Sequence, residues 1–151
     1  MKIYVASSWR NSKQYEVVAH LRASGHVVYD FRSPAPGDRG FHWSEIDPNW
    51  KSWNAEAFRA GLGHPIARDG FEKDMAALRG CDICVLVQPC GRSAHLEFGY
   101  AVSAGKLTVA LLADGSEPEL MYRMCDVLVV NFDELDTALA REETNRLTLL
   151  K

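Results

Sequence analysis

The stretch "DICVLVQPCGRSAHLEFGYA" (residues 82–101) decides the fold, because a strand, a turn and a helix follow one another in it. Residues 83–87 are apolar without interruption, which is typical of a strand buried on both faces of a parallel sheet. Turn residues follow, and a helix is predicted over 94–105, ending at Gly105. Within that helix Glu97 is an acid among small and apolar neighbours, so it needs an explanation.

The same strand–helix alternation extends over the rest of the chain. Strands are predicted at 2–7, 26–30, 82–88, 107–112 and 126–130, and helices at 11–25, 54–62, 65–80, 94–105, 118–124 and 133–142. The first helix has a possible capping box at Asn11 and Gln14 and a stop at Gly25. The helix at 65–80 has Phe71, Met75 and Leu78 on one face.

This alternation predicts one doubly wound α/β domain over residues 1–151. We expect a five-stranded, mostly parallel sheet in flavodoxin-like order, with helices on both faces. A long aromatic and proline-rich loop at about 31–53 interrupts the pattern. Its aromatic residues, including His42 and Trp43, either form a lid that stacks on a flat base or a small satellite core.

The composition narrows the classes of partner. The 151 residues have a formal net charge of −3, so no basic field attracts a nucleic-acid polymer. No apolar run approaches the roughly 20 residues that span a bilayer. The opening segment "MKIYVASSWR" is too quickly polar for a signal peptide, and we expect a cytoplasmic protein. Cys81 and Cys84 lie between a helix and a strand, which favours buried reduced thiols over a redox or zinc site.

Ligands of such sheets bind at the carboxyl ends of the strands. This rule selects "ASSWRN", "DFRSPAPG" and "QPCGRSAHLE", the segments that follow the first three strands. Neither a dinucleotide-binding nor a P-loop glycine motif is present. Glu97 follows the third strand, near the first turn of its helix, where the dipole favours the ionised carboxylate. It is either a nucleophile or an acid that stabilises its helix.

Two further groups are candidates for the same edge. Asp74 flanks the apolar stripe of its helix, so it needs a partner or a chemical task. Asp82 is better explained as a turn residue. Gly91, Arg92 and Ser93 offer backbone N–H groups, a guanidinium and a hydroxyl to one phosphate, although Arg92 is equally explained as a solvated surface side chain. His95 is better explained by packing or hydrogen bonding.

These motifs resemble a known family. "KIYVASSW" (2–9), the pair Asp74 and Asp82, "HLEFGYA" (95–101) and "GKLTVALL" (105–112) are similar to the nucleoside 2-deoxyribosyltransferases, which include deoxynucleoside 5′-monophosphate N-glycosidases. The resemblance extends from residue 2 to about 130 and leaves 31–53 unmatched. It implies a metal-free enzyme without a cofactor that forms homo-oligomers and binds a small nucleoside or nucleotide.

The resemblance also implies residue roles. Glu97 matches the nucleophile that attacks the anomeric carbon, and Asp74 matches the acid that assists departure of the base. Tyr4 matches the tyrosine that contacts the nucleophile, Trp9 a wall of the pocket, and Ser7 and Ser8 the loop that lines it. Family transferases have a further aspartate six residues before the nucleophile, where this chain has Gly91.

The sequence therefore predicts cleavage of the N-glycosidic bond of a nucleoside or its 5′-monophosphate, through a covalent glycosyl–enzyme, with transfer to water or to another base. The residues Gly91, Arg92 and Ser93 favour a phosphorylated ligand and hydrolysis. Two alternatives stay open. One is a nucleotide-binding module without turnover, and the other is a glycohydrolase of a dinucleotide such as NAD.

Overall fold

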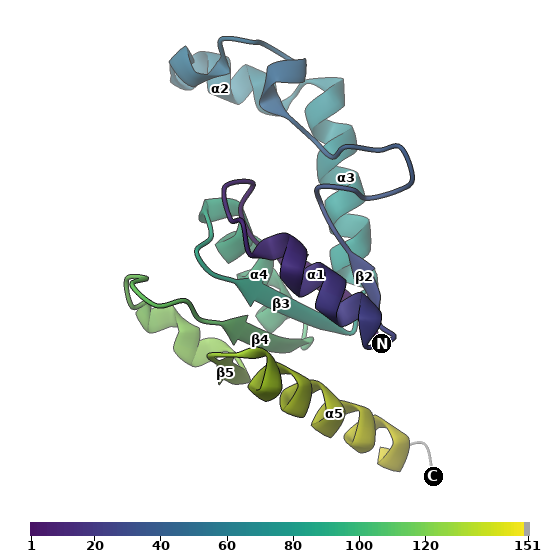
Figure 1. Cartoon of the computed structure of the whole chain (residues 1–151). Helices are drawn as coiled ribbons and strands as arrows, with labels where there is room; N and C mark the ends of the chain where they lie inside the picture. The colour runs from purple at the N-terminus through teal and green to yellow at the C-terminus, as the bar shows by residue number, and fades with distance from the viewer. Residues whose placement is uncertain (150–151) are drawn as a thin grey trace.

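The protein is built around a parallel sheet of five strands, β1 (Lys2–Ala6), β2 (Val27–Tyr29), β3 (Ile83–Val87), β4 (Leu107–Leu111) and β5 (Val127–Val129). A computed structural model describes residues 1–149 of the chain. The strand order is β2-β1-β3-β4-β5, and each of the four pairings is parallel (Figure 1). This confirms the predicted doubly wound, flavodoxin-like order.

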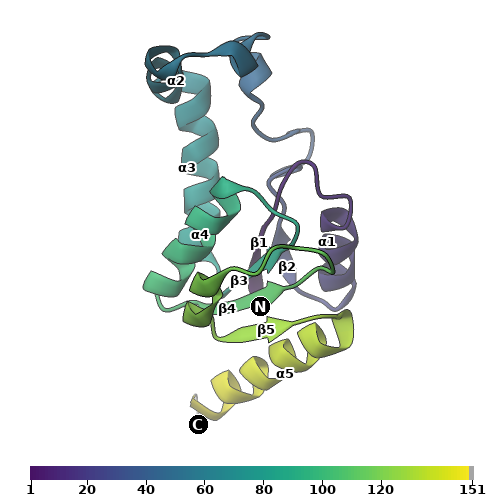
Figure 2. The ribbon, with the colours of Figure 1, turned by 90° about the vertical axis from the view of Figure 1, so that its left-hand side faces the viewer.

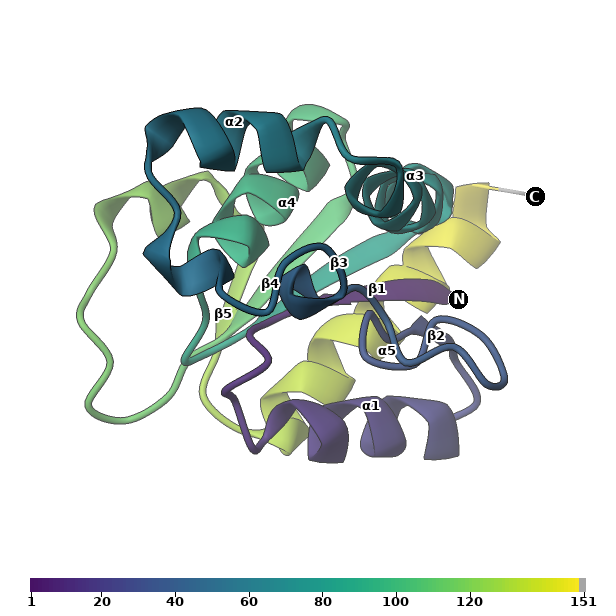
Figure 3. The same cartoon turned by 90° about the horizontal axis from the view of Figure 1, so that it is seen from above.

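Helices cover both faces of the sheet. Helices α1 (Gln14–Ala23) and α5 (Phe132–Leu149) lie on one face, and α3 (Pro65–Gly80) and α4 (Arg92–Ser103) lie on the other (Figure 3). Helix α2 (Ala55–Leu62) and three short 3-10 helices, η1 (Trp43–Glu45), η2 (Trp50–Ser52) and η3 (Leu120–Met124), complete the described elements. No helix within residues 1–149 is long and apolar enough to cross a membrane.

Alternation along the strands creates two cores. On β1, Ile3 and Val5 pack toward the valines and leucines of α1 and α5, whereas Tyr4 and Ala6 pack toward α3 and α4. Because successive side chains of a strand point to opposite faces, one strand supplies both cores. The core on the side of α3 and α4 contains Tyr4 and several cysteines and alanines, and it is therefore the more polar of the two.

Segment 41–61 forms an arm that extends beyond the sheet together with the first turns of α3 (Figures 1 and 2). Within it Trp43 contacts Phe41 with ring centroids 4.7 Å apart, Trp53 at 5.6 Å and Phe58 at 6.3 Å. These four residues are called the aromatic cluster below. Their packing agrees with the satellite core that was one of the two explanations of this segment, although none of the four is fully buried and Phe58 is 52% exposed. Helix α3 continues through Gly70, where any side chain would collide with Phe41.

Two predicted contacts were wrong, and one predicted helix stop is confirmed. The Asn11–Gln14 capping box does not form, because the Gln14 amide donates to Asp30 Oδ1 at 2.8 Å. The predicted stop at Gly25 is confirmed by its φ of +85°, which is unfavourable for other residues. Phe71 is 58% exposed rather than packed with Leu78.

Candidate active site

Glu97 lies on the stripe of α4 that faces the sheet. Ala94, Phe98 and Ala101 are the buried residues of this helix, and Glu97 follows Ala94 by three positions and precedes Ala101 by four. Residues at these spacings share one helix face, so the fold directs Glu97 inward. Helix α4 starts at Arg92, which makes Glu97 its sixth residue. Glu97 therefore lies in the second turn, just beyond the first turn near which the sequence placed it, and the dipole of the helix end has little effect on it.

Asp74 occupies the equivalent position on α3. The buried residues of α3 are Ala67 and Leu78, which lie seven positions before and four positions after Asp74. The carboxyl group is therefore on the inner face of α3, partly buried, as its position beside the apolar stripe predicted. Helices α3 and α4 are neighbours over the same face of the sheet, and they bring Asp74 and Glu97 together (Figure 2). These two groups are called the carboxyl pair below.

Two tyrosines lie beside the carboxyl pair. Tyr4 on β1 and Tyr29 on β2 are partners in the parallel register, so their side chains point to the same face of the sheet. Their rings stack with centroids 5.3 Å apart and planes inclined by 16°. The Tyr29 hydroxyl donates to Asp74 Oδ1 at 2.8 Å. The Tyr4 hydroxyl is fully buried and has no hydrogen-bond partner of standard geometry among the described residues.

The surroundings of the carboxyl pair oppose ionisation. Burial, followed by the negative charge of Asp74, raises the pKa of Glu97 from 4.5 to about 7, while the nearby Tyr4 hydroxyl acts weakly in the opposite direction. Burial also raises the pKa of Asp74, although the hydrogen bond from Tyr29 partly offsets it. The expected ionised form of Glu97 is therefore disfavoured, and the pair retains a proton up to about pH 7.

The predicted serines of the β1–α1 loop serve mainly the loop itself. The buried Ser7 hydroxyl donates to the Val87 carbonyl at 2.9 Å and accepts from Asn11 Nδ2 at 3.0 Å. Ser8 accepts from the backbone N–H of Arg10 at 3.2 Å. Their proposed contact with a substrate stays a prediction. The Ser7 network fixes the carboxyl ends of β1 and β3 relative to each other.

Arg32 fastens this loop to the segment that follows β2. Its Nη2 donates to the carbonyls of Ser8, Trp9 and Asn11 at 2.8, 2.8 and 2.9 Å. Trp9 is 43% exposed and contacts His42, with ring centroids 4.2 Å apart. Trp9 and His42 thus stand together at the surface, where a ligand can reach them, whereas Trp43 belongs to the aromatic cluster.

The predicted phosphate residues open helix α4. Gly91 is the N-cap residue, and Arg92 and Ser93 are exposed in the first turn. A Cβ added at Gly91 would meet no atom within 4 Å. The Arg92 side chain makes no hydrogen bond or ion pair within residues 1–149, so its guanidinium is available to an anion.

A polar network behind this turn was missed by sequence reasoning. His95 Nδ1 donates to the Gly91 carbonyl at 2.8 Å, and its Nε2 accepts from the Tyr122 hydroxyl at 3.0 Å. Gln88 Nε2 donates to the same hydroxyl at 3.0 Å. Tyr122 comes from η3, and no local pattern in the sequence links it to β3. Sequence reasoning also missed Tyr29 as a site residue, although its position at the carboxyl end of β2 was a signal that could have identified it.

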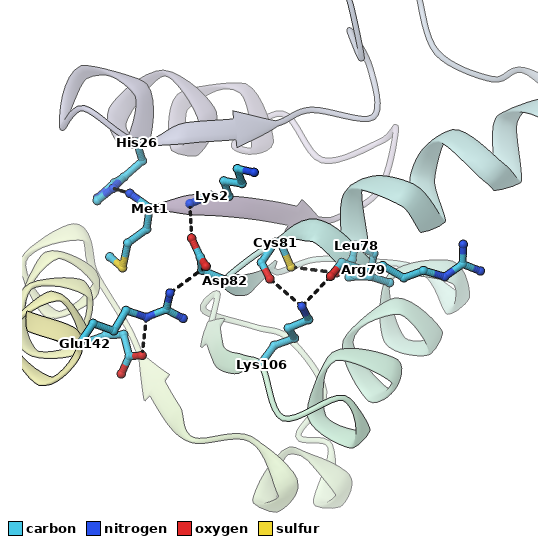
Figure 4. Close-up of polar contacts among 10 residues, drawn as sticks. Met1, Lys2, His26, Leu78, Arg79, Cys81, Asp82, Lys106 and Glu142 are labelled. Carbon is cyan, nitrogen blue, oxygen red and sulfur yellow. Dashed lines mark hydrogen bonds and ion pairs between the residues drawn. The ribbon is translucent and has the colours of Figure 1, made fainter. Parts of the chain in front are cut away.

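Asp82 lies at the amino end of the central strand β3, away from the carboxyl ends of the strands, and Figure 4 shows its polar contacts. It accepts from the Lys2 backbone N–H at 2.7 Å and from Arg146 Nη1 at 2.7 Å. These bonds connect β1, the start of β3 and α5, and they lower the pKa of Asp82 against the effect of its partial burial. Asp82 is therefore a structural residue, as the sequence favoured. Cys81, beside it, is a buried free thiol.

A cleft of about 80 Å³ lies beside Asp74 on the side of the arm, and Glu97 is not among the residues that line it. Tyr29 and Asp74 line its inner end, and Phe41, Asp38 and Lys73 are among its other walls. A larger hollow of about 670 Å³ lies between β5 and α5, and none of the predicted site residues lines it. Within residues 1–149 no group of three or more His, Cys, Asp or Glu side chains is arranged to hold a metal ion.

Comparisons with known proteins show which proteins share this fold. No family model matches the sequence, and no curated protein matches it significantly. Among solved structures, a 2-deoxyribosyltransferase from Bacillus psychrosaccharolyticus is 20% identical over 89% of this chain and 90% of its own, with a TM-score of 0.58. The CMP N-glycosidase of Clostridium botulinum is 15% identical over 93% of this chain and 99% of its own, with a TM-score of 0.52. At these identities the likeness shows a shared fold.

Proposed function

We propose that this protein cleaves the N-glycosidic bond of a nucleoside 5′-monophosphate or nucleoside, with Glu97 as the nucleophile. The observation that supports it most strongly is the inward-facing carboxyl pair with Tyr4 at the ligand edge of the sheet. Two solved structures with this fold are a 2-deoxyribosyltransferase and a CMP N-glycosidase, which agrees with such chemistry.

In the first step the Glu97 carboxylate attacks the anomeric carbon of the sugar. A carbon–oxygen bond forms as the carbon–nitrogen bond breaks, and the base departs with the electron pair of that bond. Asp74 gives the base a proton. Positive charge that develops on the sugar is stabilised by the close carboxylate, as in retaining glycosidases.

In the second step water or another base attacks the same carbon and releases Glu97. The incoming molecule loses a proton to Asp74, which returns the pair to its starting state. This cycle needs a charged Glu97 and a protonated Asp74. The pair holds one proton up to about pH 7, mostly on Glu97, so the reaction proceeds from the minor form in which Asp74 carries that proton.

Residues 91–93 favour hydrolysis of a phosphorylated substrate. Gly91 stands where the transferases that the sequence resembles have an aspartate, so an acid for base exchange is missing there. Arg92 is exposed beside the first N–H groups of α4, and a guanidinium at a helix start suits a phosphate.

The direct test is a screen for free base, by liquid chromatography, over nucleosides and their 5′-monophosphates. Wild-type protein is expected to release base from at least one of them, and Glu97→Gln is expected to release none while remaining folded. Turnover by Glu97→Gln near the wild-type rate would contradict the nucleophile assignment. Including NAD in the screen tests for nicotinamide release, and calorimetry on unreactive compounds detects binding without turnover.

A further inference from the structure

The two tyrosines are matched one to one with the two carboxyl groups. Tyr29 donates a hydrogen bond to Asp74, while the unpartnered Tyr4 hydroxyl is close enough to Glu97 to influence its ionisation. The parallel register places both tyrosines at the same level of the sheet, and their rings stack. A displacement of Tyr29 would therefore affect both halves of the site.

The hydrogen bond from Tyr29 reaches only one oxygen of Asp74. Within residues 1–149 it is the one side-chain hydrogen bond that Asp74 makes, and it ends on Oδ1. The second oxygen, Oδ2, has no partner in this part of the chain and is free to give a proton to a departing base. Fixing Oδ1 restricts rotation of the carboxyl group, so the direction in which Oδ2 points is restricted too.

We propose that Tyr29 is a positioning residue for the carboxyl pair: its hydroxyl orients Asp74 for proton transfer, and its ring holds Tyr4 beside Glu97. This inference rests on the proposed function, since it assigns Tyr29 a part in that reaction. Tyr29 acts through Asp74 and Tyr4, and no contact with the substrate is required of it.

The other charged groups near Asp74 cannot replace Tyr29. Asp38, from the segment after β2, and Lys73, from α3 itself, act on Asp74 through charge alone and in opposite directions. Glu97 faces it from α4, and no hydrogen bond joins the two carboxyl groups in the described part of the chain. Lys73 is held by ion pairs to Asp38 at 3.0 Å and to Asp69 at 2.9 Å. Loss of the Tyr29 hydroxyl therefore leaves the ionised Asp74 without its hydrogen-bond donor.

The test uses Tyr29→Phe, which keeps the stacked ring and removes only the hydroxyl. Carboxyl carbon NMR on the full chain follows the titration of Asp74 and Glu97 in each variant. The midpoint of Asp74 is expected to rise by roughly one pH unit in Tyr29→Phe, because a hydrogen bond to the charged form is lost. Tyr15→Phe, at a 65% exposed tyrosine on α1, is the matched control and should leave both titrations unchanged.

Kinetics supply the second reading. On the substrate that the base-release screen identifies, Tyr29→Phe should lower kcat by about tenfold to a hundredfold with little change in KM, as expected when a general acid is misplaced. An unchanged Asp74 titration overturns the inference whatever the activity, and so does a shifted titration with wild-type kcat. If wild-type protein releases no base from any compound, the proposed function fails, and the inferred role of Tyr29 in that reaction is overturned with it.

Discussion

Replacement of Glu97 by glutamine should stabilise the folded chain at pH 8 and have a much smaller effect at pH 4.5. The reason is that the folded structure disfavours the charge of Glu97, whose pKa is raised to about 7 by burial and by Asp74. Glutamine has nearly the same shape and no charge. The ionised Glu97 is thus expected to reduce the stability of the folded chain, which agrees with the proposed catalytic role.

The magnitude follows from the proton that the folded chain retains. Between pH 4.5 and about 7 the folded state keeps a proton on Glu97 that the unfolded state has lost. In this window the unfolding free energy therefore falls as the pH rises, by about 1.4 kcal/mol per pH unit. Accumulated over the window, the loss is roughly 3 kcal/mol, and it is complete above pH 7.

Urea denaturation of wild type and Glu97→Gln at several pH values measures this loss. The difference between the two unfolding free energies cancels most groups that titrate identically in both proteins. We expect the difference to move in favour of Glu97→Gln as the pH rises from 4.5 to 8. A difference that does not vary with pH would refute the reasoning, because it would show that Glu97 ionises in the folded state as it does in the unfolded chain.

Three further substitutions test other parts of the account. Arg92→Ala should raise KM for a 5′-monophosphate at least tenfold and leave KM for the matching nucleoside unchanged, because one charge-assisted contact to phosphate is lost. Equal effects on both KM values would show that Arg92 does not bind the phosphate. Gly91→Asp should fold, because its side chain has free space, and should raise the melting temperature slightly, because aspartate is a better N-cap than glycine. It should also increase the ratio of base exchange to hydrolysis. An unchanged product ratio would show that an acid at position 91 does not determine this ratio. Gly40→Ala should lower the free energy of unfolding by more than the roughly 1 kcal/mol expected for backbone strain alone, because φ at Gly40 is +71° and the new Cβ would overlap the Phe31 carbonyl. Gly37→Ala is the matched control, because φ at Gly37 is +82° and its Cβ would lie in open space. Equal losses of stability in urea would contradict the contact with Phe31.

The strands were predictable because each has its own signal, and their order followed from the strand–helix alternation of a doubly wound domain. Residues 83–87 are apolar throughout and are buried throughout, and the helices after β1 and β3 follow from their spacing. The inward direction of Asp74 also followed from helix periodicity, because position on a helix face is a local property. The inward direction of Glu97 was not predicted, although the spacing of Ala94, Glu97 and Ala101 contains the same signal.

What the sequence did not predict depends on contacts between distant segments. The predicted capping box does not form, because the Gln14 side-chain amide donates instead to the buried Asp30. The expectation that the helix dipole favours the ionised form of Glu97 was wrong, because it ignored burial and the charge of Asp74, which both raise the pKa. The pairing of Tyr29 with Asp74 joins residues 45 positions apart and depends on the arrangement of β2 and α3.

The central claim, that Glu97 forms a covalent bond to the sugar, is tested most directly by intact-protein mass spectrometry. Wild-type protein is mixed with the substrate found in the screen and quenched in acid within milliseconds. Wild-type protein is expected to form a species heavier by the mass of the sugar moiety, attached to the peptide that contains Glu97, and Glu97→Gln is expected to form none. Base release without this adduct, or an adduct on a different residue, would contradict the claim.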